Sequence, residues 1–188
     1  QQLEEAFCQL TGNQHAIAVC SATAGMHVTL MALDIGPGDE VIVSDYSFPA
    51  TANVVEDLGA RPIFADVSLE TFNMLPSALE QAISPRTRAV IFVDALGSPV
   101  GLNDIAEICR AKGIPLIEDA ACAIGSSERG LRCGAIADLT CFSFHPRKLL
   151  TTGEGGAITT RHPEWVGWFD RKLSHGAEGM SGPGLDFV

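Results

Sequence analysis

The residues with the clearest chemical potential lie between positions 140 and 156, where an apolar run ends at Ser143 and a glycine-rich segment follows. Lys148 is the only lysine between Lys112 and Lys172. Desolvation by apolar neighbours disfavours the ammonium ion, and a neutral amine can form a Schiff base with a carbonyl compound. The pattern therefore indicates a reacting lysine. The alternative is a loop lysine whose ammonium group reaches solvent.

Two adjacent acidic residues, Glu118 and Asp119, follow the apolar segment 113–117. Carboxylates at the end of a buried strand are costly unless a cation meets them. Because successive side chains of a strand point to opposite faces, only one of the two is expected to share a pocket with Lys148. Asp119 is the stronger candidate. The alternative is that Asp119 caps a turn or pairs with an arginine.

A phosphate site and a ring contact are predicted earlier in the chain. The small residues 21–25 open an expected helix, with Ser21 or Thr23 as its N-cap, and free N–H groups at such a start bind phosphate. An ordinary N-cap is the alternative. Phe48 lies at a strand-to-helix junction, where open α/β sheets bind ligands, so it could stack on a flat ring or belong to the core.

The elements that must position these residues alternate between strand and helix patterns. Strands are expected at 15–20, 40–44, 61–65, 88–93, 113–117, 135–143 and 155–160, and helices at 2–9, 21–33, 47–58, 76–83, 103–112 and 162–174. Asn103 is the expected cap of its helix. The alternation predicts an α/β fold with right-handed crossovers and a mostly parallel sheet of the seven-stranded type, covered by helices on both faces.

Composition narrows the function classes. The chain has 188 residues, 46% of them hydrophobic, which is enough for one globular domain. A net charge of −11 argues against binding to nucleic acid or an anionic membrane. No run has the length of a membrane span, and the first residues do not resemble a signal peptide. Six cysteines without a CxxC pair indicate free thiols in a reducing, cytoplasmic compartment, and no metal site is expected.

Six stretches match one family in order across nearly the whole chain: 21–27, 38–42, 48–53, 117–121, 142–148 and 152–156. Together they resemble the DegT/DnrJ/EryC1/StrS family of sugar aminotransferases, which use pyridoxal 5'-phosphate (PLP) on the fold-type-I, aspartate aminotransferase-like scaffold. The first stretch is especially similar to the members that form UDP-4-amino-4-deoxy-L-arabinose, although one stretch assigns no substrate.

The resemblance implies a role for each candidate residue. Lys148 would bind PLP covalently and then move the proton during transamination, while Asp119 would face the pyridine nitrogen and keep it protonated. Phe48 would cover the ring. The phosphate would be held by the backbone amides of Thr23 and Ala24 and by the hydroxyl of Ser143.

Two positions depart from the family pattern. Cys122 stands where members usually carry Gln or His, and we expect it to lie beside the cofactor. Because a thiol is a weak donor, either the contact to the cofactor is lost, which tunes it, or another group replaces that contact. Asp94 stands in the segment 93–97 where a histidine is more common, which affects the neighbouring substrate contacts. Family members are about twice as long, so 1–188 is expected to be a truncated PLP-binding large domain without the smaller C-terminal domain. The segment 181–188 is expected to begin a further apolar element.

These observations predict a PLP-dependent aminotransferase, acting as a homodimer, that converts a nucleotide-linked keto sugar to an amino sugar with glutamate as donor and 2-oxoglutarate as product. The alternative is a non-catalytic remnant that serves as a binding or dimerisation module. A third possibility, a sugar dehydratase on the same fold, is disfavoured because those relatives carry His where this chain has Lys148.

Overall fold

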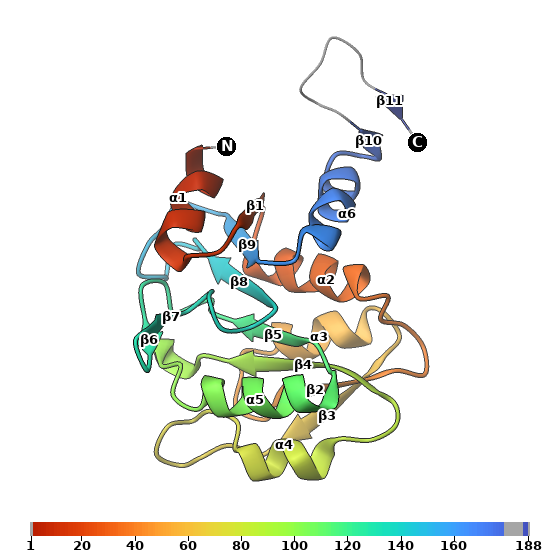
Figure 1. Cartoon of the computed structure of the whole chain (residues 1–188), viewed down its shortest axis with the longest axis vertical. Helices are drawn as coiled ribbons and strands as arrows, with labels where there is room; N and C mark the ends of the chain where they lie inside the picture. Colours follow the sequence, from red (N-terminus) through yellow and green to blue (C-terminus); the bar gives the residue numbers. More distant parts are fainter. Residues whose placement is uncertain (1, 179–185, 188) are drawn as a thin grey trace.

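The computed structural model describes residues 2–178 and 186–187, and a seven-stranded sheet forms its centre (Figure 1). The sheet order is β1-β9-β8-β5-β4-β2-β3. Its strands are β1 (His15–Val19), β2 (Glu40–Ser44), β3 (Arg61–Ala65), β4 (Thr87–Val93), β5 (Leu116–Asp119), β8 (Leu139–Ser143) and β9 (Gly156–Thr160). β9 is antiparallel to both of its neighbours, and the other neighbouring pairs are parallel. This confirms the prediction of a mostly parallel α/β sheet.

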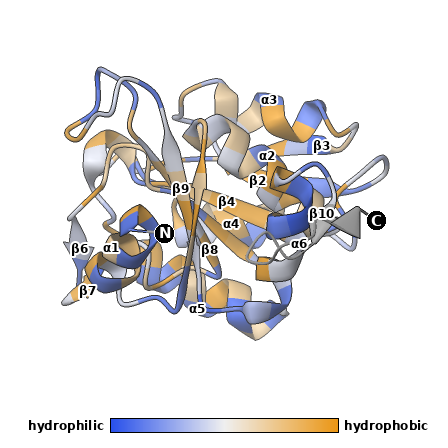
Figure 2. Ribbon diagram, turned by 90° about the horizontal axis from the view of Figure 1, so that it is seen from above, coloured by the Kyte–Doolittle hydropathy of each residue, from blue (hydrophilic) through white to orange (hydrophobic). Residues whose placement is uncertain are grey.

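Helices cover both faces of the sheet. They are α1 (Gln2–Thr11), α2 (Ala22–Ala32), α3 (Ala50–Glu56), α4 (Pro76–Ala82), α5 (Leu102–Lys112) and α6 (Pro163–Leu173), with a short 3-10 turn η1 at Ala95–Gly97. Leu30, Val54 and Phe169 from α2, α3 and α6 share one apolar core, whereas Leu79 and Ile105 from α4 and α5 belong to the core on the other face. Figure 2 shows the hydrophobic colouring of the central strands β4 and β2 between these layers.

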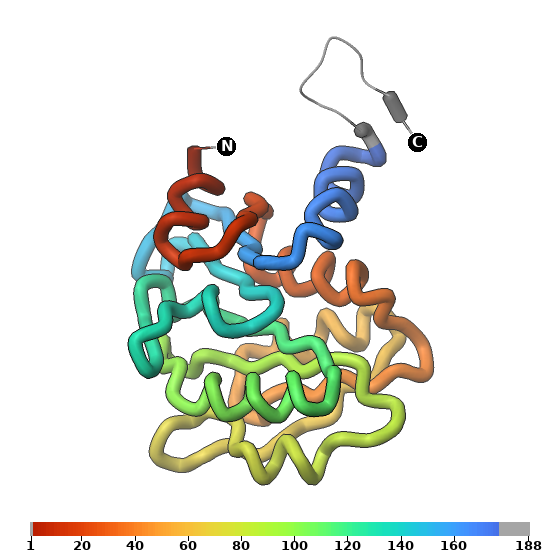
Figure 3. The backbone as a smooth tube through the Cα atoms, in the orientation of Figure 1, coloured from red at the N-terminus to blue at the C-terminus, as the bar shows by residue number. Residues whose placement is uncertain are grey.

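Helices α1 and α6, red and blue in Figure 3, lie at one end of the molecule on either side of β1. The ring of Phe7 in α1 packs 5.3 Å from the rings of both Phe142 and Phe144, which anchors the start of the chain to β8. A short hairpin and a further antiparallel strand pair complete the described elements: β6 (Ser127–Glu128) with β7 (Leu131–Arg132) in the hairpin, and β10 (Ala177–Glu178) paired with β11 (Asp186–Phe187). None of the described helices is long and apolar enough to cross a membrane.

The predicted cap of α5 and the predicted starts of two strands are wrong. One of these strands, expected at 135–143, begins only at Leu139. Helix α5 begins at Leu102 after Gly101, so Asn103 is not its cap. The carboxylate of Glu128 in the β6–β7 hairpin takes over the capping, because it accepts hydrogen bonds from the backbone N–H groups of Gly101 (2.7 Å) and Asn103 (2.8 Å). The strand expected at 113–117 starts at Leu116 and continues to Asp119. The segment 181–188 lies outside the described residues apart from positions 186 and 187.

Candidate active site

The predicted site residues come from the edge of the sheet at which the parallel strands end. Asp119 is the last residue of β5 and Ser143 the last residue of β8, while Lys148 lies in the loop that follows β8. Phe48 lies in the segment between β2 and α3. Because β2, β4, β5 and β8 run in the same direction, their carboxyl ends share one edge, where open α/β sheets place ligands.

Asp119 is held by two donors in a buried position. Its side chain is 6% exposed, and Oδ2 accepts a hydrogen bond from the hydroxyl of Thr51 at 3.1 Å. Oδ1 accepts from the backbone N–H of Ala121 at 3.2 Å. Burial raises the pKa of Asp119, and these two hydrogen bonds and the positive charge of Lys148 partly offset that rise. The carboxyl group is thus fixed in orientation and lies within electrostatic reach of the lysine.

Lys148 and Cys122 meet at the mouth of the site. The Nζ atom of Lys148 lies 3.1 Å from the Sγ atom of Cys122, which is exposed in the turn after β5. The backbone of the lysine is fixed too, since its N–H donates to the carbonyl of His145 at 2.9 Å. His145 stabilises the same loop through its Nδ1, which accepts from the N–H of Arg147 at 3.2 Å. Cys122 therefore contacts the amine that the sequence singled out as reactive.

A glycine contact brings the start of α2 to the end of β8. Gly156 pairs with Ser143 across β8 and β9. A Cβ atom at Gly156 would lie 2.8 Å from the carbonyl carbon of Ser21 and 2.9 Å from the nitrogen of Ala22, so only glycine permits this approach. Ser21 is the N-cap of α2, and its hydroxyl accepts from the N–H of Ala24 at 3.1 Å. The structure therefore confirms Ser21 as the cap, and Gly156 contacts both this cap and the end of β8.

The aromatic candidate Phe48 is 71% exposed, so the expectation that it could be a core residue is wrong. Other large apolar side chains at the carboxyl edge are exposed as well: Tyr46 by 47%, Leu96 by 76% and Leu149 by 83%. Phe48 is thus free to stack on a planar ligand. These exposed residues lie in the loops that follow β2, β4 and β8.

Thr51 is a site residue that the sequence analysis missed. It lies in α3, one helical turn after the aromatic residue at the junction, and it is 1% exposed. Its hydroxyl also lies 2.6 Å from the hydroxyl of Ser47, so a chain of polar contacts leads from the surface to Asp119. The sequence did offer one signal for this residue, because Thr51 lies in the helix expected directly after Phe48, at the border of the predicted site.

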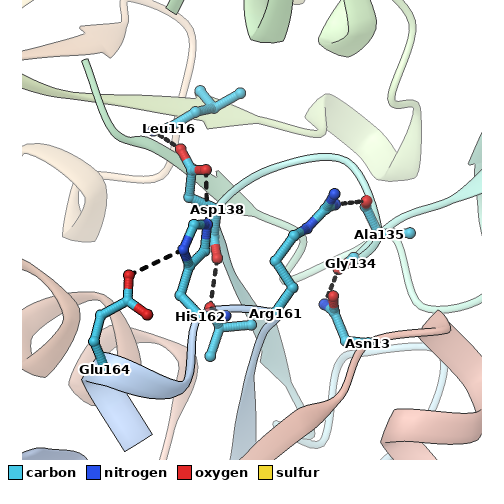
Figure 4. A network of polar contacts seen from close by, with 9 residues as sticks. Asn13, Leu116, Gly134, Ala135, Asp138, Arg161, His162 and Glu164 are labelled. Carbon is cyan, nitrogen blue, oxygen red and sulfur yellow. Dashed lines mark hydrogen bonds and ion pairs between the residues drawn. The ribbon is translucent and has the colours of Figure 1, made fainter. Parts of the chain in front are cut away.

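A different polar network occupies the opposite edge of the sheet, where the strands begin (Figure 4). His162 lies between two carboxylates, with Nε2 3.2 Å from Asp138 and Nδ1 3.1 Å from Glu164. Asp138 also accepts from the N–H of Leu116 at 2.8 Å, so the network joins β5, the start of β8 and α6. A cavity of about 290 Å³ lies beside it, with Trp165 in its wall. None of the predicted catalytic or cofactor-binding residues lines this cavity.

The comparisons with known proteins point to one family. The family model for DegT/DnrJ/EryC1/StrS aminotransferases matches residues 1–182. The aminotransferase TlmJ from Streptoalloteichus hindustanus is 35% identical, with a TM-score of 0.93, and the match covers 100% of this chain and 51% of that one. The PMP-form structure of the sugar aminotransferase Spr1654 from Streptococcus pneumoniae is 31% identical (TM-score 0.91; 100% and 52% covered). 3-Amino-5-hydroxybenzoic acid synthase is 34% identical (TM-score 0.86; 93% and 45% covered).

The chain spans about half the length of these solved relatives, since it covers 51%, 52% and 45% of them. Spr1654 has been solved in both PLP and PMP forms, which are the two states of the cofactor of an aminotransferase. The matched region includes every element that carries the candidate site. The chain belongs to the DegT/DnrJ/EryC1/StrS aminotransferase family, whose members depend on PLP.

Proposed function

We propose that this chain is the cofactor-binding large domain of a PLP-dependent aminotransferase that converts a nucleotide-linked keto sugar to an amino sugar, with glutamate as the amino donor. The observation that carries the proposal is that an amine and a buried carboxylate lie at the same carboxyl edge of the sheet. Asp119 ends β5 and Lys148 follows β8, the neighbouring parallel strand, and both residues are held by hydrogen bonds to neighbouring groups.

The residues present fit PLP. A phosphate group is bound by N–H donors and hydroxyls, and Gly156 contacts the start of α2 and is paired with Ser143 in the sheet. A protonated pyridine nitrogen needs a buried carboxylate, which Asp119 supplies, and a flat ring needs an aromatic cover, which the exposed Phe48 can supply. The amide of Ala24 donates to Ser21, so a phosphate would either share that N–H or rely more on Thr23.

When bound, PLP acts as an electron sink for the substrate carbon that loses its proton. Lys148 would hold the cofactor through its Nζ atom and would move the proton at the substrate carbon. Asp119 would keep a proton on the pyridine nitrogen, and Thr51 and Ala121 hold the Asp119 carboxylate in place. Cys122 orients the amine of Lys148 from the mouth of the site.

A spectroscopic titration tests this proposal. The purified protein is mixed with PLP, and the visible absorption is recorded before and after glutamate is added. We expect a band that Lys148→Ala abolishes and that glutamate bleaches. Lys112→Ala is the matched control, because Lys112 ends α5 at the opposite edge of the sheet and should leave the band unchanged. A band that persists in Lys148→Ala would disprove the role of this lysine.

Two further results test the substrate class and the alternative function. The amino-cofactor form is presented with a nucleotide-linked keto sugar and with the same sugar without the nucleotide, and return of the absorption band reports transfer. We expect return only with the nucleotide-linked compound. A protein that binds PLP but does not respond to glutamate would instead be the non-catalytic binding module.

We further propose that the protein is a cytoplasmic homodimer. Four large apolar residues in the loops at the carboxyl edge are exposed, which supports a second copy that covers this edge: Tyr46, Phe48, Leu96 and Leu149. The six cysteines are all free, which supports a reducing compartment. Sedimentation equilibrium checks the dimer: Leu149→Asp should shift the protein to the monomer, and a monomeric unmodified protein would contradict the proposal.

A further inference from the structure

Two carboxyl groups and a thiol meet in the interior on the face of β5 opposite to Asp119. Glu118 is fully buried, Asp94 is 1% exposed and Cys133 is 2% exposed. One oxygen or sulfur atom from each residue lies within 4.8 Å of the others. The ionisable groups that face Asp94 are Glu118, Cys133 and Asp119, and none of these three is cationic.

The hydrogen bonds at this cluster leave a definite deficit of donors. One oxygen of Glu118, Oε2, accepts from the N–H of Gly134 at 3.0 Å and from the hydroxyl of Thr140 at 2.8 Å. Three other buried oxygens have no partner: Oδ1 and Oδ2 of Asp94 and Oε1 of Glu118. A buried acceptor without a donor carries a large desolvation penalty. Two ionised carboxylates offer no hydrogen-bond donor, so the three oxygens can be satisfied only if the cluster carries additional donor hydrogens.

We infer that Asp94 and Glu118 share one proton, which resides on Asp94 and is donated to Oε1 of Glu118, while the thiol of Cys133 donates to the other oxygen of Asp94. With these two hydrogens, each of the three unpartnered oxygens takes part in a hydrogen bond. The same arrangement lowers the charge of the pair from two negative charges to one, which a dry interior strongly favours.

The electrostatics agree on which residue holds the proton. Burial raises the pKa of Asp94 well above its ordinary value, and the neighbouring Glu118 raises it further. Burial also raises the pKa of Glu118, but the donors Gly134, Asp94 and Thr140 offset part of that rise. Glu118 thus has more donors to stabilise a negative charge, and Asp94 is the better site for the proton. Such a pair titrates as one unit.

The pair also positions the candidate catalytic carboxylate. The backbone N–H of Asp94 donates to the carbonyl of Asp119 at 3.1 Å, and Val93 is paired with Asp119 in the sheet. Asp94 and Glu118 therefore join the carboxyl ends of β4 and β5 directly behind Asp119. A neutral Asp94 leaves one negative charge on this face, so the carboxylate of Asp119 does not lie beside two others. Asp94 is in this sense a positioning residue.

A divalent cation is the competing occupant of the cluster, since two carboxylates and a thiolate can bind one. The structure favours the proton because the shared carboxyl proton and the thiol hydrogen of Cys133 are enough to give each of the three unpartnered oxygens a hydrogen bond. The thiol is also hard to ionise, because burial and the two neighbouring acids raise the pKa of Cys133 far above its ordinary value. An ion would in addition require a path through side chains that are at most 2% exposed.

Infrared spectroscopy of the purified protein tests the inference directly. A protonated carboxyl group has a carbonyl stretch that is separate from the carboxylate bands, so the unmodified protein should show one such band at neutral pH. Asp94→Asn should remove it, because the amide donates to Glu118 permanently without a proton to lose. Asp104→Asn is the matched control, since Asp104 lies on the surface in an ion pair with Arg129, and it should keep the band.

The pH dependence of unfolding gives a second readout. A carboxyl group whose folded-state pKa is raised binds more protons in the folded state, so its contribution to stability falls as pH rises from the unfolded-state pKa to the folded-state one. The unfolding constant of the unmodified protein should rise up to about tenfold per pH unit in this window relative to Asp94→Asn. If Asp94→Asn does not fold, Glu118→Gln should likewise remove the infrared band. A band that persists in both variants, or stability that a metal chelator removes, would overturn the inference.

Discussion

Replacing Gly156 by alanine tests the contact that assembles the proposed phosphate site. The added Cβ atom would lie 2.6 Å from the carbonyl oxygen of Phe142, 2.8 Å from the carbon of Ser21 and 2.9 Å from the nitrogen of Ala22. All three are backbone atoms, so a side-chain rotation cannot relieve the overlap. Either β8 or the start of α2 must move away from β9. Overpacking of this kind costs ~1–3 kcal/mol, which lowers the melting temperature by ~2–12 °C in a protein of this size.

The measurement combines thermal unfolding with a titration of PLP. We expect Gly156→Ala to lower the melting temperature and to weaken PLP binding by at least about tenfold, because the start of α2 and Ser143 separate. Gly36→Ala is the matched control, since a Cβ atom at Gly36 meets no atom within 4 Å and should change neither quantity. If Gly156→Ala were as stable as Gly36→Ala and bound PLP equally well, the close approach would not be what assembles the site.

Three further outcomes are expected. Asp119→Asn should weaken PLP binding at least about tenfold, yet leave the protein as stable or more stable at neutral pH. Burial raises the pKa of the Asp119 carboxyl group, so its contribution to the free energy of unfolding falls as pH rises toward that pKa. A loss of stability in denaturant titrations would contradict this. Glu128→Ala should lower the free energy of unfolding by ~1–3 kcal/mol, since the N–H groups of Gly101 and Asn103 lose their acceptor; an unchanged urea midpoint would refute the capping role. Leu30→Ala, at a fully buried position, should cost ~2–5 kcal/mol by the same assay, whereas a cost below ~0.5 kcal/mol would show that α2 is not anchored by this core.

Much of the fold could be predicted because each strand and helix has a local signal. The apolar runs located the strands of the sheet to within a few residues, and proline at the first turn marked the start of α4 and α6. The order of the strands could not be predicted. β9 inserts antiparallel between β1 and β8, but short apolar strands that are buried on both faces carry no information about which neighbour they pair with.

Capping shows the same limit at the scale of single residues. Asn103 has the residue type of a cap, and residue type was the only guide that the sequence offered. The acceptor that satisfies the start of α5 is Glu128, which lies 25 residues further along and reaches the helix only because the β6–β7 hairpin folds beside it. Nothing in the sequence around Glu128 indicates that its carboxylate binds the start of α5.

The proposed catalytic residues were predictable, but the residues that hold them were not. Asp119 and Lys148 could be found because a carboxylate at a strand end and an isolated lysine before glycines are unusual in themselves. Thr51 and Asp94 act through contacts that exist only after folding: a hydroxyl from α3 and a backbone N–H from the neighbouring strand end both reach Asp119. Threonine and aspartate have many other roles in folded proteins, so the residue type alone does not predict these contacts.

Glu118 and Asp119 show how one strand end serves two opposite electrostatic requirements. The alternation of β5 directs Asp119 toward two donors and a lysine, which favour a negative charge, and directs Glu118 toward another acid, which requires a proton. The two faces are coupled, because Asp94 bonds to the backbone of Asp119 and would add a third negative charge there if it ionised. Raising the pH should therefore weaken the two-strand junction that carries Asp119, and Asp94→Asn should remove that sensitivity while leaving both faces of the strand in place.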